Sequence, residues 1–304
     1  MSPVARPPAT EAVAPTFPPQ ARMLLATSTS GLCNRLLNLA GSLRIARLLG
    51  RDFLLHWPLN RELGAGFHEL FENDLPLATT EHMAQLLHTE SRVTVYQTER
   101  GGKVNRAYCR GIVPGDDAHI LVVKGWGLPA LRWEGPERAR RESLPVLREL
   151  QPVAEVRALV ERHAPPPGSV GIHVRRGDSA AFFARSQDEH YLALMRGVLA
   201  VQPGATFFLC TDDARAEATL REALPGRIHS LPKATHGMEA RGSVPGMREA
   251  VADLWLLART RAIVGNHRST FSTTAALLGA GRLVVADATS SGRRLDASVL
   301  ALLG

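Results

Sequence analysis

The segment 171–178 combines residue types that bind charged phosphate groups. It reads GIHVRRGD, an apolar run that carries His173 and ends in Arg175 and Arg176. Arginine suits phosphate because its planar guanidinium donates two parallel hydrogen bonds. Ligands of open parallel sheets lie at the carboxyl ends of strands, where these arginines would emerge. Because side chains alternate along a strand, we expect His173 and Arg175 to share a face and Arg176 to point elsewhere, toward a loop partner such as Asp178.

A second apolar run ends in two acidic residues. The segment 207–213 reads FFLCTDD, so Asp212 and Asp213 follow a predicted strand. Paired carboxylates can bind a metal ion, but Asp213 also begins the helix-like run ARAEATLREAL. An aspartate at a helix start caps free N–H groups and suits the helix dipole. We therefore interpret Asp213 as a helix cap and predict no metal site.

A third segment places an acidic residue and several hydroxyls around another strand. Residues 247–258 carry an apolar stripe at helical spacing, and Asp253 lies off that stripe. A short apolar run then leads to the sequence NHRST, which includes Ser269 and Thr270, at the start of a further helix. Hydroxyls and free N–H groups at a helix start form an anion site, so these residues can cap the helix, bind an anion, or do both.

The elements that would hold these residues alternate between strand and helix. A strand at 23–27, a loop ending in Gly31, a helix at 33–49 and a strand at 52–56 form a βαβ unit, which predicts a parallel sheet. Further strands are predicted at 93–97, 119–123, 169–174, 206–211, 227–231, 262–265 and 282–286. Helices are predicted at 136–163, with a restart at Pro152, and at 188–200, 214–223, 247–259 and 270–278.

The run APPPG at 164–168 interrupts the chain between two alternating halves. We therefore predict an α/β fold of two Rossmann-like domains, 21–150 and 151–304, whose parallel sheets face across a cleft. Residues 1–20 contain six prolines and no continuous apolar core. They are predicted to be a flexible Pro/Ala-rich leader rather than a signal peptide.

Composition narrows the function classes. The net charge is +7, and only three of the 36 basic residues are lysines, which fits either codon bias or arginines facing phosphate. The arginines are evenly spread and aromatics make up 5% of the chain, so we expect no nucleic-acid partner. Three distant cysteines without a CxxC pair argue against disulfides and zinc, and indicate a cytoplasmic protein. No apolar run is long enough for an integral membrane segment.

Taken together, the motifs resemble the fucosyltransferase superfamily, which includes nodulation and core α1,6-fucosyltransferases and the protein O-fucosyltransferases. An early G-x-x-N turn, an H-x-R-x-G-D stretch, a strand ending in T-D-D, and a D-L-x-x-L-A helix leading to a Ser-rich loop all occur in family order. They span roughly residues 23–290, at 31–34, 173–178, 211–213, 253–259 and 269–272.

The resemblance implies a GT-B-like fold and an inverting transfer from a GDP-sugar donor, with L-fucose as the expected sugar and no metal or other cofactor. It implies that Arg175 binds the β-phosphate and stabilises the departing GDP. It assigns guanosine contacts to His173 and Asp253, and phosphate contacts to the start of the first helix and to the Ser-rich loop (Gly31, Asn34, Ser269 and Thr270). Fixed cations can replace a metal because leaving-group charge must be neutralised by one or the other.

The chain also departs from the family pattern. Core-fucosylating members carry an acidic residue, the proposed general base, a few positions past the motif. Here residues 181–183 read AFF, and the later Asp188 and Glu189 are the candidates to substitute. Cys33 stands where the family often has glycine. The chain lacks the long helical and SH3-like additions of animal core enzymes, so glycoprotein core fucosylation is not expected.

Two other functions are alternatives to a transferase. The missing acidic residue motivates a nucleotide-sugar-binding protein without activity. A dinucleotide-dependent oxidoreductase would need G-x-G-x-x-G after the first strand, and the loop reads GLCNRL instead. No residue between 58 and 135 marks an acceptor site, so the acceptor can be a glycan, a peptide or a small molecule.

Overall fold

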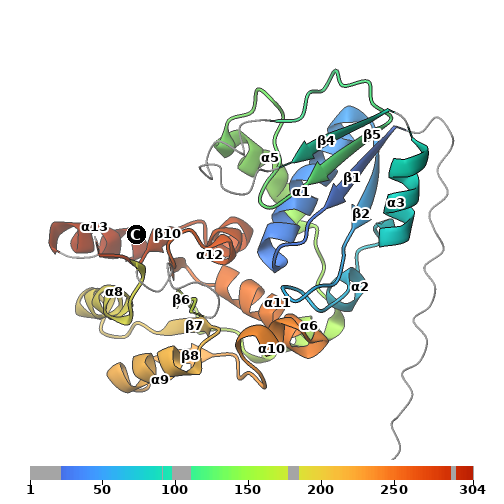
Figure 1. Ribbon diagram of the computed structural model, residues 1–304. Helices are drawn as coiled ribbons and strands as arrows, with labels where there is room; N and C mark the ends of the chain where they lie inside the picture. The colour runs from blue at the N-terminus through green and yellow to red at the C-terminus, as the bar shows by residue number, and fades with distance from the viewer. Residues whose placement is uncertain (1–21, 91, 98–110, 177–184, 289–291, 304) are drawn as a thin grey trace, which may run out of the picture.

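The computed structural model describes residues 22–90, 92–97, 111–176, 185–288 and 292–303. The proposed leader and Asp178 lie outside the described residues. The chain forms two parallel five-stranded sheets with helices packed on both, one in each half of the sequence (Figure 1). This confirms the predicted fold class.

The first sheet has the order β3-β2-β1-β5-β4, with all strands parallel. Its strands are β1 (Met23–Thr27), β2 (Asp52–His56), β3 (Leu77–Ala78), β4 (Val93–Gln97) and β5 (Ile120–Lys124). The central β1 is buried along its whole length, because its alternate side chains serve two cores. Leu24 and Ala26 pack with α1 (Leu32–Leu49), whereas Met23 and Leu25 pack toward α3 (Thr80–Thr89).

The second sheet repeats this plan with the order β10-β9-β6-β7-β8. Its strands are β6 (Val170–Val174), β7 (Phe207–Thr211), β8 (Ile228–Ser230), β9 (Ala262–Gly265) and β10 (Leu283–Val285). Val170, Ile172 and Val174 of β6 pack toward α8 (Asp188–Val201). The intervening residues, including His173, therefore face the opposite side, toward α11 (Val244–Ala258).

The remaining helices agree with the sequence in most places. The segment predicted at 136–163 forms α5 (Pro136–Arg148) and α6 (Ala154–Arg162), with the break near Pro152 that proline imposes. The helix predicted at 270–278 is α12 (Thr270–Ala275) followed by the short π-helix η1 (Ala276–Ala280). The other helices are α2 (Phe67–Leu70), α9 (Ala214–Ala223), α10 (Gly237–Arg241) and α13 (Gly292–Leu303). None of the described helices is both long and apolar enough to cross a membrane.

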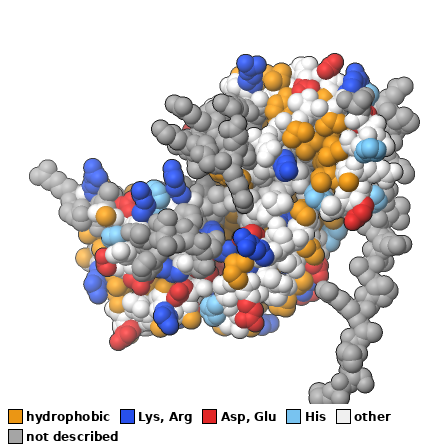
Figure 2. Space-filling view, viewed as in Figure 1, with side chains coloured by type: hydrophobic (Ala, Val, Ile, Leu, Met, Phe, Trp, Pro, Cys, Tyr) orange, Lys and Arg blue, Asp and Glu red, His pale blue; other side chains and the backbone are white. Residues whose placement is uncertain are grey.

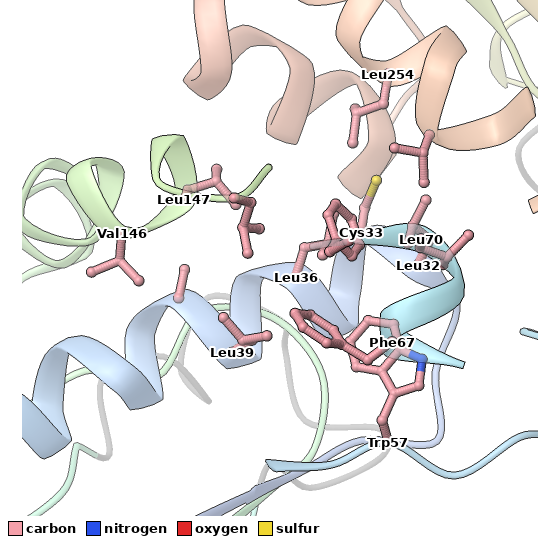
Figure 3. Packing of buried hydrophobic residues seen from close by; sticks show 14 of the residues in the cluster. Leu32, Cys33, Leu36, Leu39, Trp57, Phe67, Leu70, Val146, Leu147 and Leu254 are labelled. Atoms are coloured by element: carbon pink, nitrogen blue, oxygen red, sulfur yellow. The ribbon is translucent and has the colours of Figure 1, made fainter. Parts of the chain in front are cut away.

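The two halves share one hydrophobic core. Leu254 of α11 is fully buried in the same cluster as Leu36 of α1 and Leu70 of α2 (Figure 3). The backbones also touch at the edge of this interface, where the Gly64 N–H donates to the Arg241 carbonyl at 2.7 Å. A side chain on Gly64 would collide with the backbone of Gly242, so this approach requires glycine.

We predict that Leu254→Ala lowers the free energy of unfolding by about 2–5 kcal/mol, because it opens a cavity in the shared core. Since both halves bury surface there, urea unfolding should remain a single transition in tryptophan fluorescence and circular dichroism. The control is Leu300→Ala on α13, which is 64% exposed and should change stability little. Two separated transitions, with only one shifted by Leu254→Ala, would contradict a shared core.

Candidate functional site

A cavity of about 530 Å³ lies between the two halves, at the carboxyl ends of strands from both sheets. The first sheet contributes the ends of β1, β4 and β5, through Thr27, Gln97 and Lys124. The second contributes the ends of β6 and β7, through Arg175 and Thr211. This is the position at which open parallel sheets bind ligands.

Arg175 is held at the end of β6 by a side chain from the neighbouring strand. Its backbone N–H donates to Asn266 Oδ1 at 2.6 Å, and its carbonyl accepts from Asn266 Nδ2 at 3.3 Å. The Tyr191 hydroxyl lies 2.7 Å from the same Oδ1. The backbone at Arg175 is therefore fixed, and its side chain lines the cavity.

Arg176 has a different environment from its neighbour, as strand alternation predicts. Its guanidinium forms an ion pair with Asp188 at the start of α8, lies over the Tyr191 ring, and is only 7% exposed. It is not among the residues that line the cavity in the described part of the chain. The two adjacent arginines therefore have separate surroundings.

His173 lies on the same side of β6 as Arg175 and lines the cavity. Its Nδ1 is 2.8 Å from Ser272 Oγ, and its ring stacks on Phe271 with centroids 4.8 Å apart. Burial, with the nearby charges of Arg175 and Lys233, lowers the pKa of His173 to about 3. The imidazole is therefore neutral at physiological pH and fixed in orientation, so it can hydrogen-bond a ligand without carrying charge.

Asp253 faces the same cavity from α11. Its Oδ2 is 2.6 Å from Nζ of Lys233, which also donates to the Thr211 carbonyl at 2.5 Å. Sequence reasoning did not single out Lys233, because it lies in an irregular segment after β8 that has no strand or helix periodicity.

The Gly31 turn brings the start of α1 to the cavity. Gly31 and Asn34 both line it, and Asn34 Oδ1 is buried without a hydrogen-bond partner among the described residues. Arg35 anchors this turn, because its Nε donates to the Ser30 carbonyl at 2.5 Å and its Nη1 to the Pro58 carbonyl at 2.6 Å. The first turn of an 18-residue helix, rich in unpaired N–H groups, is thereby held toward the ligand space.

The other predicted site residues divide between the cavity and its surroundings. Thr270 lines the cavity at the start of α12, whereas Ser269 is buried behind it as the N-cap residue. Asp188 and Glu189 begin α8, and neither is among the described residues that line the cavity. The helix-cap interpretation of Asp213 is confirmed, since its Oδ1 accepts from the Ala216 N–H at 2.9 Å.

Within the described part of the chain, four carboxylates line the cavity: Glu62, Asp212, Glu249 and Asp253. Arg241 lies between two of them, 3.2 Å from Glu62 in the first half and 3.6 Å from Asp212 in the second. Among the described residues, no group of three or more His, Cys, Asp or Glu side chains is placed to hold a metal ion. On the face shown in Figure 2, Lys and Arg side chains are spread over both halves rather than gathered in one patch.

Comparison with known proteins finds relatives by structure alone. No protein-family model matches the chain, and no curated protein matches it in sequence. A structure of NodZ α-1,6-fucosyltransferase soaked with GDP-fucose is similar over 90% of this chain and 97% of its own, with TM-score 0.63 and 20% identity. Another NodZ structure is from Bradyrhizobium, with TM-score 0.57 and 20% identity over 85% of this chain and 92% of its own.

Two further fucosyltransferases share the fold. A mutant of Arabidopsis thaliana FUT1 in complex with GDP has TM-score 0.57 and 18% identity, over 87% of this chain and 70% of its own. POFUT1 in complex with GDP-fucose has TM-score 0.53 and 13% identity, over 88% of this chain and 98% of its own. The GT-B-like fold expected from the sequence motifs is thus confirmed.

The separate surroundings of the two arginines lead to a test. We predict that Arg175→Ala and Arg175→Lys lower the kcat/KM of sugar transfer or donor hydrolysis by roughly 10²- to 10³-fold, because the bidentate guanidinium contact to the leaving group is lost. Both variants should melt near the wild-type temperature. Arg176→Ala is the matched control, and it should lower the melting temperature more and the rate less. A folded Arg175→Ala protein with near-wild-type activity would contradict the assignment.

Proposed function

We propose that the protein is an inverting, metal-independent glycosyltransferase that transfers a sugar, L-fucose, from a GDP-sugar to an acceptor. The observation that carries this proposal is Arg175, fixed by Asn266 at the end of β6 and facing a cavity between two Rossmann-like sheets. Structures of the same fold were determined with GDP-fucose, namely NodZ and POFUT1. The shared fold and the placement of an arginine at the strand end support the same donor here.

In this mechanism the diphosphate lies between Arg175 and the start of α1. Cleavage of the sugar–phosphate bond builds negative charge on the leaving GDP, which Arg175 neutralises through paired hydrogen bonds. The N–H groups at the Gly31 turn add fixed positive potential without a metal ion. The neutral His173 and the carboxylate of Asp253 contact the guanosine, and Thr270 and Ser269 support the phosphate end.

We place the acceptor on the side of the cavity that the first sheet lines. The ends of β4 and β5 and the residues after them bring Gln97, Lys124 and Trp126 to the cavity lining. This side also carries Glu62, which lines the cavity from the first half of the chain. We propose Glu62 as a third candidate for the base that deprotonates the acceptor hydroxyl, beside Asp188 and Glu189.

A nucleotide-sugar-binding protein without activity remains the second candidate function. The placement of Asp188 and Glu189 outside the described cavity lining favours it, because neither carboxylate is shown near the reacting groups. Release of GDP from GDP-fucose separates the two functions, since only an enzyme turns over the donor.

We propose that the protein acts in the cytoplasm, where the buried thiols of Cys33 and Cys210, which form no disulfide, would stay reduced.

The donor site yields a binding prediction. GDP should raise the melting temperature in the absence of added Mg²⁺ or Mn²⁺, because arginine and helix N–H groups meet the diphosphate charge, and bound ligand stabilises the folded state. The shift should be unchanged by EDTA and smaller for UDP at equal concentration. Loss of both GDP binding and donor turnover on EDTA treatment would overturn metal independence.

The base can be identified by comparing three isosteric variants. A general base contributes roughly 10²- to 10⁴-fold to the rate, so we expect Glu62→Gln to lower GDP-fucose turnover within that range while the GDP-induced melting shift persists. Asp188→Asn and Glu189→Gln are the matched comparisons from α8. If either of these variants loses much of its rate while Glu62→Gln stays near wild type, the general base is the α8 carboxylate and not Glu62.

A further inference from the structure

A buried ion pair forms part of the cavity wall. Nζ of Lys233 lies 2.6 Å from Oδ2 of Asp253, and the two side chains are 14% and 5% exposed. The same ammonium donates to the Thr211 carbonyl at the end of β7. Lys233 therefore ties the segment after β8 to β7 and α11 at one point of the site. Burying two charges is costly unless further hydrogen bonds compensate, so a buried pair is weak grounds for a purely stabilising role.

The two oxygens of Asp253 have different surroundings. Oδ2 faces Lys233, whereas Oδ1 is buried and has no hydrogen-bond partner among the described residues. Buried acceptors in folded proteins are nearly always satisfied, and an exception calls for an explanation. Because Asp253 lines the cavity, a ligand that brings an N–H donor to this wall would satisfy Oδ1.

We propose that Lys233 is a positioning residue for nucleobase specificity, which keeps Asp253 charged so that its carboxylate accepts from a base edge with two adjacent N–H donors. The inference rests on the proposed function, because it takes the ligand to be GDP. Guanine offers N1–H and the N2 amino group side by side, and an ionised carboxylate accepts from both. A protonated carboxyl would instead set its own O–H against N1–H. Adenine, which places an acceptor beside its amino group, would suit that protonated form.

The groups around the ion pair indicate that Lys233 favours the charged form of Asp253. Burial raises the pKa of Asp253 above its ordinary value, and Lys233, together with the nearby Cys210 thiol, opposes that rise. Asp253 in turn raises the pKa of Lys233, although burial alone would lower it. The other titratable groups near the pair are His173, Cys210, Asp212, Glu217 and Glu249. Arg175, Arg241 and His236 also line the cavity, but none of them is among the groups that shift the pKa of Asp253. Among the described groups that act on this carboxylate, Lys233 supplies the positive charge, so its loss removes the main interaction that favours ionisation.

The experiment measures the Kd of GDP and UDP by calorimetry between about pH 7 and 8.5, where GDP itself changes its protonation little, for the wild type and Lys233→Met. Wild-type GDP affinity should be flat over this range. The variant should bind GDP about 10- to 100-fold more weakly at pH 7, the loss expected for a charge-assisted hydrogen bond. Affinity should return as the pH rises, since the raised pKa of Asp253 must be passed before the carboxylate ionises. UDP affinity, which does not use the guanine edge, should change little.

Arg140→Met is the control, because it also removes a cation paired with a carboxylate, Glu137, but lies on α5 and is not among the described residues that line the cavity. It should leave GDP affinity and its pH dependence unchanged. Lys233→Gln keeps an N–H donor for the Thr211 carbonyl and should show the same weaker, pH-dependent GDP affinity as Lys233→Met. It replaces the methionine variant if that variant does not fold. A folded Lys233 variant with wild-type GDP affinity and pH profile would overturn the inference alone. A wild-type protein that binds no GDP would overturn the proposed function as well.

Discussion

The site depends on the burial of α11 against the first half of the chain. Leu254 packs with Leu36 and Leu70 in one core, so the two sheets are held at a fixed separation and their strand ends face each other. The same helix carries Asp253 one residue earlier, and its side chain reaches the cavity. The helix α11 therefore contributes both to the shared core and to the cavity wall, and a change in its position would move the two together.

Some of the cationic side chains in and behind the cavity form ion pairs with carboxylates. Arg176 is neutralised by Asp188 behind the site, and Lys233 by Asp253 within it. The backbone of Arg175 is fixed by two hydrogen bonds with the Asn266 side chain. An arginine whose backbone is held in this way would need little reorganisation to meet the diphosphate of the proposed donor.

Sequence patterns predicted most of the fold, because long apolar runs and alternating polarity are local signals. They missed β3, which has only two residues, and α13, which lies beyond the last predicted strand. Strand alternation is a local rule and predicts different surroundings for Arg175 and Arg176, whereas the phosphate role of Arg175 comes from the family resemblance. Lys233 and Glu62 were not predicted, because each reaches the cavity from an irregular segment, and only the packing of distant elements shows it. Asp188 was chosen for its nearness in sequence to the arginines, and the structure pairs it with Arg176.

The contact between Gly64 and Gly242 limits how this protein can change over evolution. The two backbones touch where a side chain on Gly64 would collide with the backbone of Gly242, and the Gly64 N–H is satisfied by the Arg241 carbonyl of the other half. A methyl group on Gly64 would wedge the halves apart at the edge of their shared core. The halves therefore cannot drift independently or be exchanged with those of a distant homologue, as separate modules could. Recombination between chains of this fold would be expected to keep glycine at position 64 or replace the whole interface at once.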